Sequence, residues 1–169
     1  RGIVMSAQKR KANPSPDIMV KLAVKAEQAG LDSIWVGDSL VSKPRFEPIA
    51  ALSYLAAHTD RIKLGTSVLL PALRNPVTLA HSLVTLNILS KGRLIIGAGV
   101  GGAFNADQKK DWLSVGVDPA IRARRFTETI QIMKIRYGEN CANNFQELSF
   151  NSPLNINGVK VTFFPAGHI

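Results

Sequence analysis

The chain has 169 residues, of which 46% are hydrophobic and 20% are charged, and its formal net charge is +9. This length predicts one domain with a buried core, and the balance of apolar to charged residues excludes a disordered chain. A single cysteine excludes a disulfide scaffold, and the sequence has no long uncharged apolar run that would predict a transmembrane helix. No signal peptide is evident, so we expect a cytoplasmic protein. Since the chain begins with Arg1 rather than methionine, we expect its first residues to be missing.

The positive charge gathers in two clusters, at 9–11 and at 122–125. Nucleic-acid binding would call for aromatic side chains beside the basic ones, to stack on bases. The first cluster contains no aromatic residue and only Phe126 follows the second, so we expect no nucleic-acid partner. The remaining interpretations are a solvated basic surface and attraction of a phosphate-bearing ligand.

Four short apolar segments are predicted to be strands, and their starts lie about 30 residues apart, the size of one strand–helix unit. Most are continuous apolar runs, which is typical of parallel strands buried on both faces. The segments are 2–5, 33–37, 62–70 and 93–97.

The first helix is predicted over 17–29, with Asp17 as its N-cap. Ile18 and Leu22 begin the apolar stripe that we expect to face the core, together with Ala26 and Ala29. Gly30 suits the left-handed conformation that ends a helix.

Further helices are predicted over 47–58 and 120–137. Between them, Asn75 is the predicted N-cap of a third helix, with Pro76 at its first position and its end near Gly92. The residues of this third helix that we expect to face inward are Leu79, Leu83, Leu86 and either Ile88 or Leu89.

Alternation of strands and helices predicts an α/β fold of consecutive parallel strands with right-handed crossovers. After residue 137 the composition changes, because asparagine crowds the segment that follows. Within that segment, 154–164 predicts a β-hairpin with 157–158 (Asn-Gly) as its two-residue turn. We therefore expect 1–137 to form the parallel region and 138–169 to be an insertion.

Polar residues at two strand ends are candidate ligand contacts. Asp38 follows the second strand, and the carboxyl ends of parallel strands are where α/β folds bind ligands. An ordinary capping aspartate is the alternative. Thr66 and Ser67, near the end of the third strand and just before Arg74, could donate hydrogen bonds to a planar ligand, or belong to an ordinary buried strand.

Gly97, Gly99 and Gly102 satisfy the G-x-G-x-x-G pattern directly after the fourth strand. That pattern lets a backbone approach a pyrophosphate at the start of a helix. Because the segment 103–111 has no clear apolar stripe, we predict no helix there and favour a glycine-rich strand end that leaves room for a flat cofactor.

Other catalytic and metal chemistry finds little support. The histidines lie outside any metal-binding pattern, so we predict no metal site. Cys141 has no nearby histidine that would activate it, and neither Ser39 nor Ser67 sits in a nucleophile elbow.

Five segments together resemble the bacterial luciferase-like oxidoreductases, in the family's order. The resemblance extends over about 17–137 and is carried by 26–38 (AEQAGLDSIWVGD), 59–68 (TDRIKLGTSV), 74–80 (RNPVTLA), 89–101 (LSKGRLIIGAGVG) and 122–133 (RARRFTETIQIM).

The resemblance implies a TIM barrel of which 1–137 would be the N-terminal half, with 138–169 as an excursion. Because a TIM barrel takes about 250 residues, we expect either a missing C-terminal half or a homo-oligomer. It also implies an enzyme acting on a small organic substrate, with coenzyme F420 for hydride transfer or FMN for monooxygenation.

The segment 71–76 looks closest to the F420-dependent branch, in which a non-prolyl cis peptide bulges the third strand against the cofactor. Its position matches Ser67-Val68. The resemblance further implies cofactor contacts from Asp38 and from the loop Gly99, Val100 and Gly101. It assigns no catalytic residue, since Ser39 stands where histidine is common in the family. Asn87 also replaces a common aspartate.

Two alternatives stay open. A non-catalytic half-barrel would assemble with itself or with a partner, because its strand edges need to be covered. An NAD-binding Rossmann-type domain would require a helix that begins at 101–102.

Overall fold

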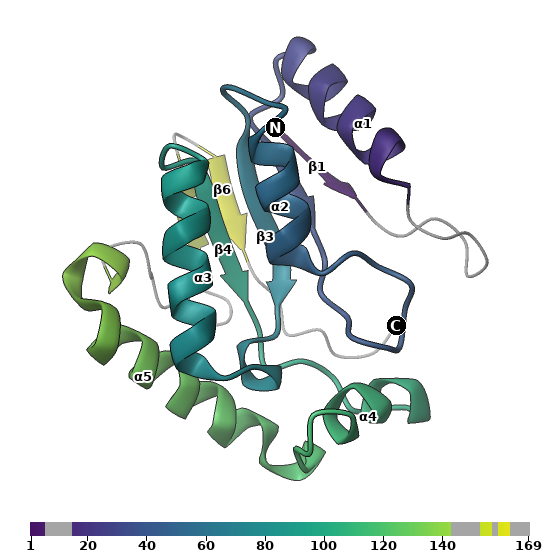
Figure 1. The fold of residues 1–169 in the computed structure, drawn as a ribbon, viewed down its shortest axis with the longest axis vertical. Coiled ribbons are helices and arrows are strands. Elements are labelled where there is room, and N and C mark those ends of the chain that lie inside the picture. The colour runs from purple at the N-terminus through teal and green to yellow at the C-terminus, as the bar shows by residue number, and fades with distance from the viewer. Residues whose placement is uncertain (6–14, 143–152, 157–158, 163–169) are drawn as a thin grey trace.

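The computed structural model describes residues 1–5, 15–142, 153–156 and 159–162 (Figure 1). Four parallel strands pair in sequence order to form one sheet. Helices α1, α2 and α3 lie beside one another on one face of this sheet (Figure 1). The strands are β1 Gly2–Met5, β2 Ser33–Val36, β3 Lys63–Leu69 and β4 Leu94–Ala98. The helices are α1 Pro16–Gln28, α2 Pro48–Ala56, α3 Pro76–Leu89, α4 Ala106–Leu113 and α5 Arg122–Ala142, with short 3-10 turns η1 Pro71–Leu73 and η2 Pro119–Ile121.

The predicted strands are confirmed to within one residue at each end, but their burial differs from the prediction. Ile34 of β2 and Leu64 of β3 are 0% exposed and pack against α1 and α2. Trp35, which follows Ile34 in β2 and faces the opposite side of the sheet, is only half-buried. Every residue of β4 is half-buried as well. The prediction of burial on both faces is therefore wrong for the described chain. An arc of four strands has helices on its outer face but no opposing strands to fill its inner face.

The start of α1 differs from the prediction by two residues. Ser15, not Asp17, is the N-cap, and its Oγ accepts a hydrogen bond from the Ile18 backbone N–H at 3.4 Å. Pro16 explains the difference, because proline is well suited to the first helical position. Gly30 has a φ of 74° after the helix, which confirms the predicted helix end.

The buried stripe of α1 is also offset by one position. Met19, Ala23 and Ala26 are buried, whereas Ile18 is 53% exposed and Leu22 is 41% exposed. Ala26 is buried as predicted, but Ala29 is exposed. Packing against α2 and the sheet therefore selects the stripe of Met19, Ala23 and Ala26.

Asn75 and Pro76 begin α3 as predicted, and the Asn75 side chain accepts hydrogen bonds from two backbone N–H groups of the first turn. At the other end of the helix the prediction is wrong, because Ile88 is 70% exposed and Leu89 is 59% exposed. The inward positions that are confirmed are Leu79, Leu83 and Leu86.

The prediction of no helix in 103–111 is wrong, because α4 begins at Ala106 within that segment. Asn105 caps it by accepting a hydrogen bond from the Gln108 backbone N–H at 2.9 Å. Only Asp111 and Trp112 of this helix are buried. A helix that contacts the protein through one pair of neighbouring residues has no stripe for a periodicity search to find.

The predicted hairpin is confirmed as β5 Pro153–Ile156 and β6 Val159–Thr162, which pair antiparallel with each other and form a sheet of their own. Its predicted turn, 157–158, and its last two predicted residues lie outside the described part of the chain. None of the described helices is long and apolar enough to cross a membrane.

Candidate functional site

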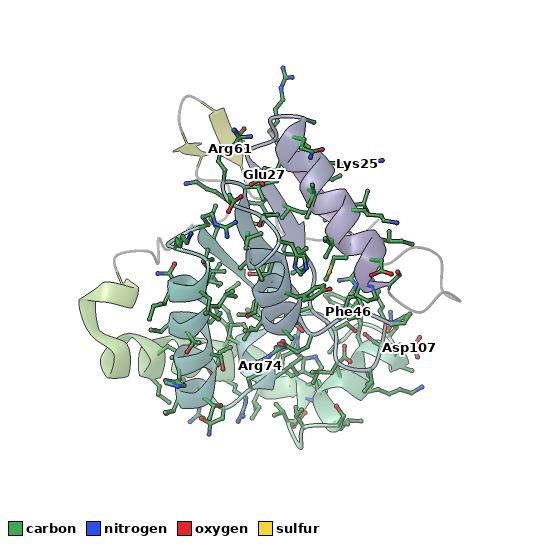
Figure 2. All side chains as sticks on the ribbon, turned by 45° about the horizontal axis from the view of Figure 1, so that its top comes forward. Lys25, Glu27, Phe46, Arg61, Arg74 and Asp107 are labelled. Carbon is green, nitrogen blue, oxygen red and sulfur yellow. The ribbon has the colours of Figure 1, made fainter. Side chains whose placement is uncertain are left out.

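The carboxyl ends of β2, β3 and β4 meet at one end of the sheet, near α4 (Figure 1). Arg74, Phe46 and Asp107 lie toward this end, and Glu27 and Arg61 lie at the opposite end (Figure 2). The predicted site residues all follow or end these three strands, so the parallel sheet brings them to the same edge.

Asp38 follows β2, and its side chain is 0% exposed. Its Oδ2 accepts hydrogen bonds from the Leu70 backbone N–H at 2.9 Å and from Arg74 Nη1 at 2.5 Å, and its Oδ1 accepts one from Arg74 Nη2 at 3.0 Å. The carboxylate thus ties the end of β2 to the turn after β3. Contact between Asp38 and a cofactor stays a prediction.

Arg74 also reaches Glu47 at the start of α2, with Nη2 at 2.9 Å from Oε1. Burial lowers the pKa of the Arg74 guanidinium, but its hydrogen bonds and charge pairing with Asp38 and Glu47 outweigh burial and raise that pKa above its usual value. The three side chains form one ion cluster that fixes β2, η1 and α2 relative to one another.

The peptide bond between Ser67 and Val68 is cis, where the family resemblance had it, and the pairing of β3 with β4 shifts register across it. Val68 is 42% exposed at this point. A Cβ built on Gly99 would lie 3.0 Å from Val68 Cγ2, so the valine side chain lies directly over the glycine backbone. Together they form an apolar surface at the ends of β3 and β4.

The loop after β4 is held by its neighbours. Gly101 has a φ of 80°, and its carbonyl oxygen accepts a hydrogen bond from Arg122 Nε at 3.3 Å. The next carbonyl, of Gly102, accepts one from Trp112 Nε1 at 2.9 Å. Val100 is half-buried before these two glycines.

No helix begins at 101–102, since α4 begins only after Asn105. The four strands also pair in chain order, so the sheet has no switch point of the kind at which dinucleotides bind. The Rossmann-type alternative is therefore wrong.

Thr66 is 1% exposed, and its Oγ1 donates a hydrogen bond to the Gly97 carbonyl oxygen at 2.9 Å. Its hydroxyl therefore joins β3 to β4 rather than facing a ligand. Ser39 is similarly engaged. It is 7% exposed, shares a hydrogen bond of 2.9 Å with Ser42 Oγ, and accepts one from the Lys43 backbone N–H at 3.0 Å.

Asp111 on α4 holds the loop that follows β2, and sequence reasoning missed it. Its Oδ1 accepts hydrogen bonds from the backbone N–H groups of Val41 at 2.6 Å and Ser42 at 3.0 Å, and its Oδ2 accepts one from Ser42 Oγ at 2.7 Å. Burial raises the pKa of Asp111, but these hydrogen bonds outweigh it and lower that pKa below its usual value. No local signal could reveal a partnership across about 70 residues.

Two arginines of the second basic cluster are structural rather than solvated. Arg122 donates to carbonyl oxygens of Gly101 and Pro119, and Arg125 Nε donates to the Ala72 carbonyl oxygen at 2.7 Å. Arg124 is exposed and pairs with Glu128. The first cluster, 9–11, lies outside the described residues.

The sequence matches the family of luciferase-like monooxygenases over residues 2–147. The chain belongs to this family. It is 37% identical over 134 residues to an F420-dependent glucose-6-phosphate dehydrogenase of Kineococcus radiotolerans. The matched region covers 74% of this chain and 38% of that protein. The enzyme of the same name from Amycolatopsis mediterranei is 36% identical over 130 residues, covering 70% of this chain and 37% of that protein. The chain thus spans less than two fifths of the length of these relatives.

Solved structures agree with the fold. The oxygenating constituent of 3,6-diketocamphane monooxygenase from Pseudomonas putida, in complex with FMN, superposes with a TM-score of 0.69 at 19% identity, over 96% of this chain and 42% of that one. The coenzyme F420-dependent tetrahydromethanopterin reductase of Methanopyrus kandleri gives a TM-score of 0.55 at 26% identity. The match covers 75% of this chain and 38% of that one. The expected fold, part of a luciferase-like TIM barrel, is confirmed.

Proposed function

We propose that this chain is part of an oxidoreductase that uses coenzyme F420 to transfer a hydride to or from a small organic substrate. The observation that carries the proposal is its identity of 37% and 36% with relatives named as F420-dependent dehydrogenases. FMN-dependent monooxygenation is the second candidate, because the family that matches most of the chain is described as one of monooxygenases.

The residues at the ends of β3 and β4 fit a planar cofactor. Val68 is exposed there and lies over Gly99, which has no side chain that would keep a flat ring away. Cofactor sites are lined predominantly by apolar side chains, as this surface is. Coenzyme F420 supplies a deazaflavin ring that carries the hydride when it is bound.

The protein would bind and orient that ring and exclude water from its face. Val68 and Gly99 would provide the apolar contact. The Asp38–Arg74–Glu47 cluster would act indirectly, by holding β2 and β3 in the arrangement that presents Val68. We assign no proton transfer to Ser39, because its hydroxyl is buried within its own loop.

We further infer that additional strands complete the barrel. Among the described residues, β1 and β4 each pair with only one strand, so each leaves one edge open. Such edges are normally covered. Either the remainder of a longer chain or a second copy could supply the strands, and light scattering on the purified chain separates these cases. An oligomer that binds neither cofactor would favour the non-catalytic half-barrel instead.

Titration of the full chain with F420 and, separately, with FMN tests the function. We expect saturable changes in the fluorescence of F420, and weaker changes in the absorbance of FMN. Tighter binding of FMN would favour the monooxygenase candidate. Binding of neither cofactor would contradict both.

A further inference from the structure

Arg45, in the loop between β2 and α2, lies over the carboxyl ends of β2 and β3. A Cβ built on Gly37 would collide with Arg45 Nη1 and lie 3.0 Å from Arg45 Cζ and 3.4 Å from the Ser67 carbonyl oxygen. The guanidinium therefore rests on the bare backbone of Gly37, beside the cis Ser67–Val68 peptide. This places a positive charge at the edge of the apolar surface formed by Val68 and Gly99.

The Arg45 guanidinium lacks a partner among the described residues. Its Nε is buried without a hydrogen-bond acceptor, and none of the ion pairs in the described part of the chain includes it. The neighbouring acids are engaged elsewhere, because Asp38 and Glu47 bind Arg74 and Asp111 binds the loop at Ser42. A buried donor left unsatisfied is destabilising and is uncommon in folded proteins.

Comparison with the other half-buried arginines of the described chain sets Arg45 apart. Each of them donates at least one hydrogen bond to a carboxylate or a carbonyl oxygen. They are Arg74, Arg93, Arg122 and Arg125. These four arginines each have an acceptor, whereas the described residues supply none at Arg45.

We propose that Arg45 binds an oxyanion, a phosphate or a carboxylate group, of the ligand that occupies this end of the sheet. A guanidinium presents paired N–H donors whose spacing matches two oxygens of such a group. The backbone of Gly37 leaves the space in which the guanidinium lies flat. The proposal rests on the proposed function for the position of the ligand, but oxyanion binding can be measured without cofactor or turnover. The oxyanion belongs either to the substrate or to the cofactor.

The first test is calorimetric titration of the full chain with inorganic phosphate at low ionic strength. We expect R45Q to weaken phosphate binding by about tenfold or more, since hydrogen bonds between charged partners are the strong ones. R61Q is the matched control, because it removes the same charge from an exposed position at the opposite end of β3 (Figure 2). The proposal would be overturned if wild type and R45Q bound phosphate equally, or if R61Q weakened binding as much as R45Q does. It would also be overturned if the wild-type chain bound no phosphate.

A second pair of ligands identifies the source of the oxyanion. FMN carries a phosphate and riboflavin does not. If R45Q weakens binding of FMN but not of riboflavin, the oxyanion belongs to the cofactor. If R45Q leaves FMN binding unchanged while phosphate binding falls, the oxyanion belongs to the substrate. A third outcome is a chain that binds phosphate through Arg45 and yet binds neither F420 nor FMN. That result would contradict the proposed function and still support oxyanion binding by Arg45.

Stability provides an independent readout. Because Arg45 donates no hydrogen bond in the described structure, we expect R45Q to keep the wild-type Tm in the absence of ligand. A fall of more than about 5 °C, which would correspond to the loss of a real structural contact in a domain of this size, would overturn the proposal by showing that Arg45 has a structural partner.

Discussion

The buried carboxylate of Asp38 receives two nitrogens of the Arg74 guanidinium, Nη1 at 2.5 Å and Nη2 at 3.0 Å. The two residues are 36 positions apart and follow different strands. Their bond ties the end of β2 to the turn after β3, and Arg74 is only 14% exposed. The arrangement of the strand ends at the candidate site therefore depends on this buried ion pair.

Removing that carboxylate should be strongly destabilising. We expect D38A to lower the free energy of unfolding by about 3–5 kcal/mol, because it leaves a buried guanidinium with only one of its two acids. D107A is the control, since Asp107 pairs with Lys110 at 3.5 Å on an exposed helix face and should cost less than about 1 kcal/mol. Urea unfolding measures both, and similar losses in the two variants would contradict the role given to Asp38.

Asp111 should make stability depend on pH. Its pKa is lower in the folded protein than in the unfolded chain, where it is about 3.9. The carboxylate therefore stabilises the fold fully at neutral pH, and this stabilisation is lost as the pH falls below about 4 through the folded pKa.

The D111N variant isolates this effect from other acids. We expect D111N to be less stable than the wild type at pH 7, and the difference between the two to shrink on acidification to about pH 3. Urea unfolding at both pH values measures it. A difference that stays constant over this range would show that the charge of Asp111 does not stabilise the loop at Val41 and Ser42.

Val68 offers a direct test of the apolar surface, and Val77 is a matched control, because both residues are 42% exposed. We expect V68E to weaken F420 binding at least about tenfold by burying a carboxylate against the ring, and V77E, on the first turn of α3, to leave binding unchanged. Both variants should remain folded by circular dichroism. Equal affinities for V68E and the wild type would place the ring elsewhere.

Gly65 makes room for the Trp35 ring on the inner face of the sheet, where a Cβ would collide with Trp35 Cε3. We expect G65A to lower the free energy of unfolding by about 1–3 kcal/mol through overpacking. In a W35L background the same substitution should cost much less, because leucine lacks the ring that collides. A double-mutant cycle by urea unfolding measures the coupling, and additive losses would contradict it.

Much of the fold could be predicted because its signals are local. The four apolar runs became the four strands, Asn75 and Pro76 began α3, and Gly30 ended α1. These features depend on residues within a few positions of one another. Predictions failed where packing chooses between similar local patterns, as at Ile18, or where one buried pair of residues holds a helix, as in α4.

The candidate site divides in the same way. Its location at the ends of β2 to β4 followed from parallel strands and from the family motifs, and the cis bond at Ser67-Val68 lies where the resemblance implied. The cofactor contacts expected from Asp38 and from 99–101 stay predictions. Arg45 escaped notice, because an arginine in a loop carries no signal until the structure shows that its buried Nε has no acceptor among the described residues.

The sequence by itself therefore determined the order of strands and helices, the family, and the edge of the sheet at which a ligand would bind. Only the tertiary structure decided which polar side chains serve the fold and which stay available. Asp38 binds Arg74, which is 36 residues away in the sequence, and Asp111 accepts a hydrogen bond from Ser42, which is 69 residues away. A charge is satisfied by whatever lies within about 3 Å in space, and the order of residues along the chain does not contain that distance.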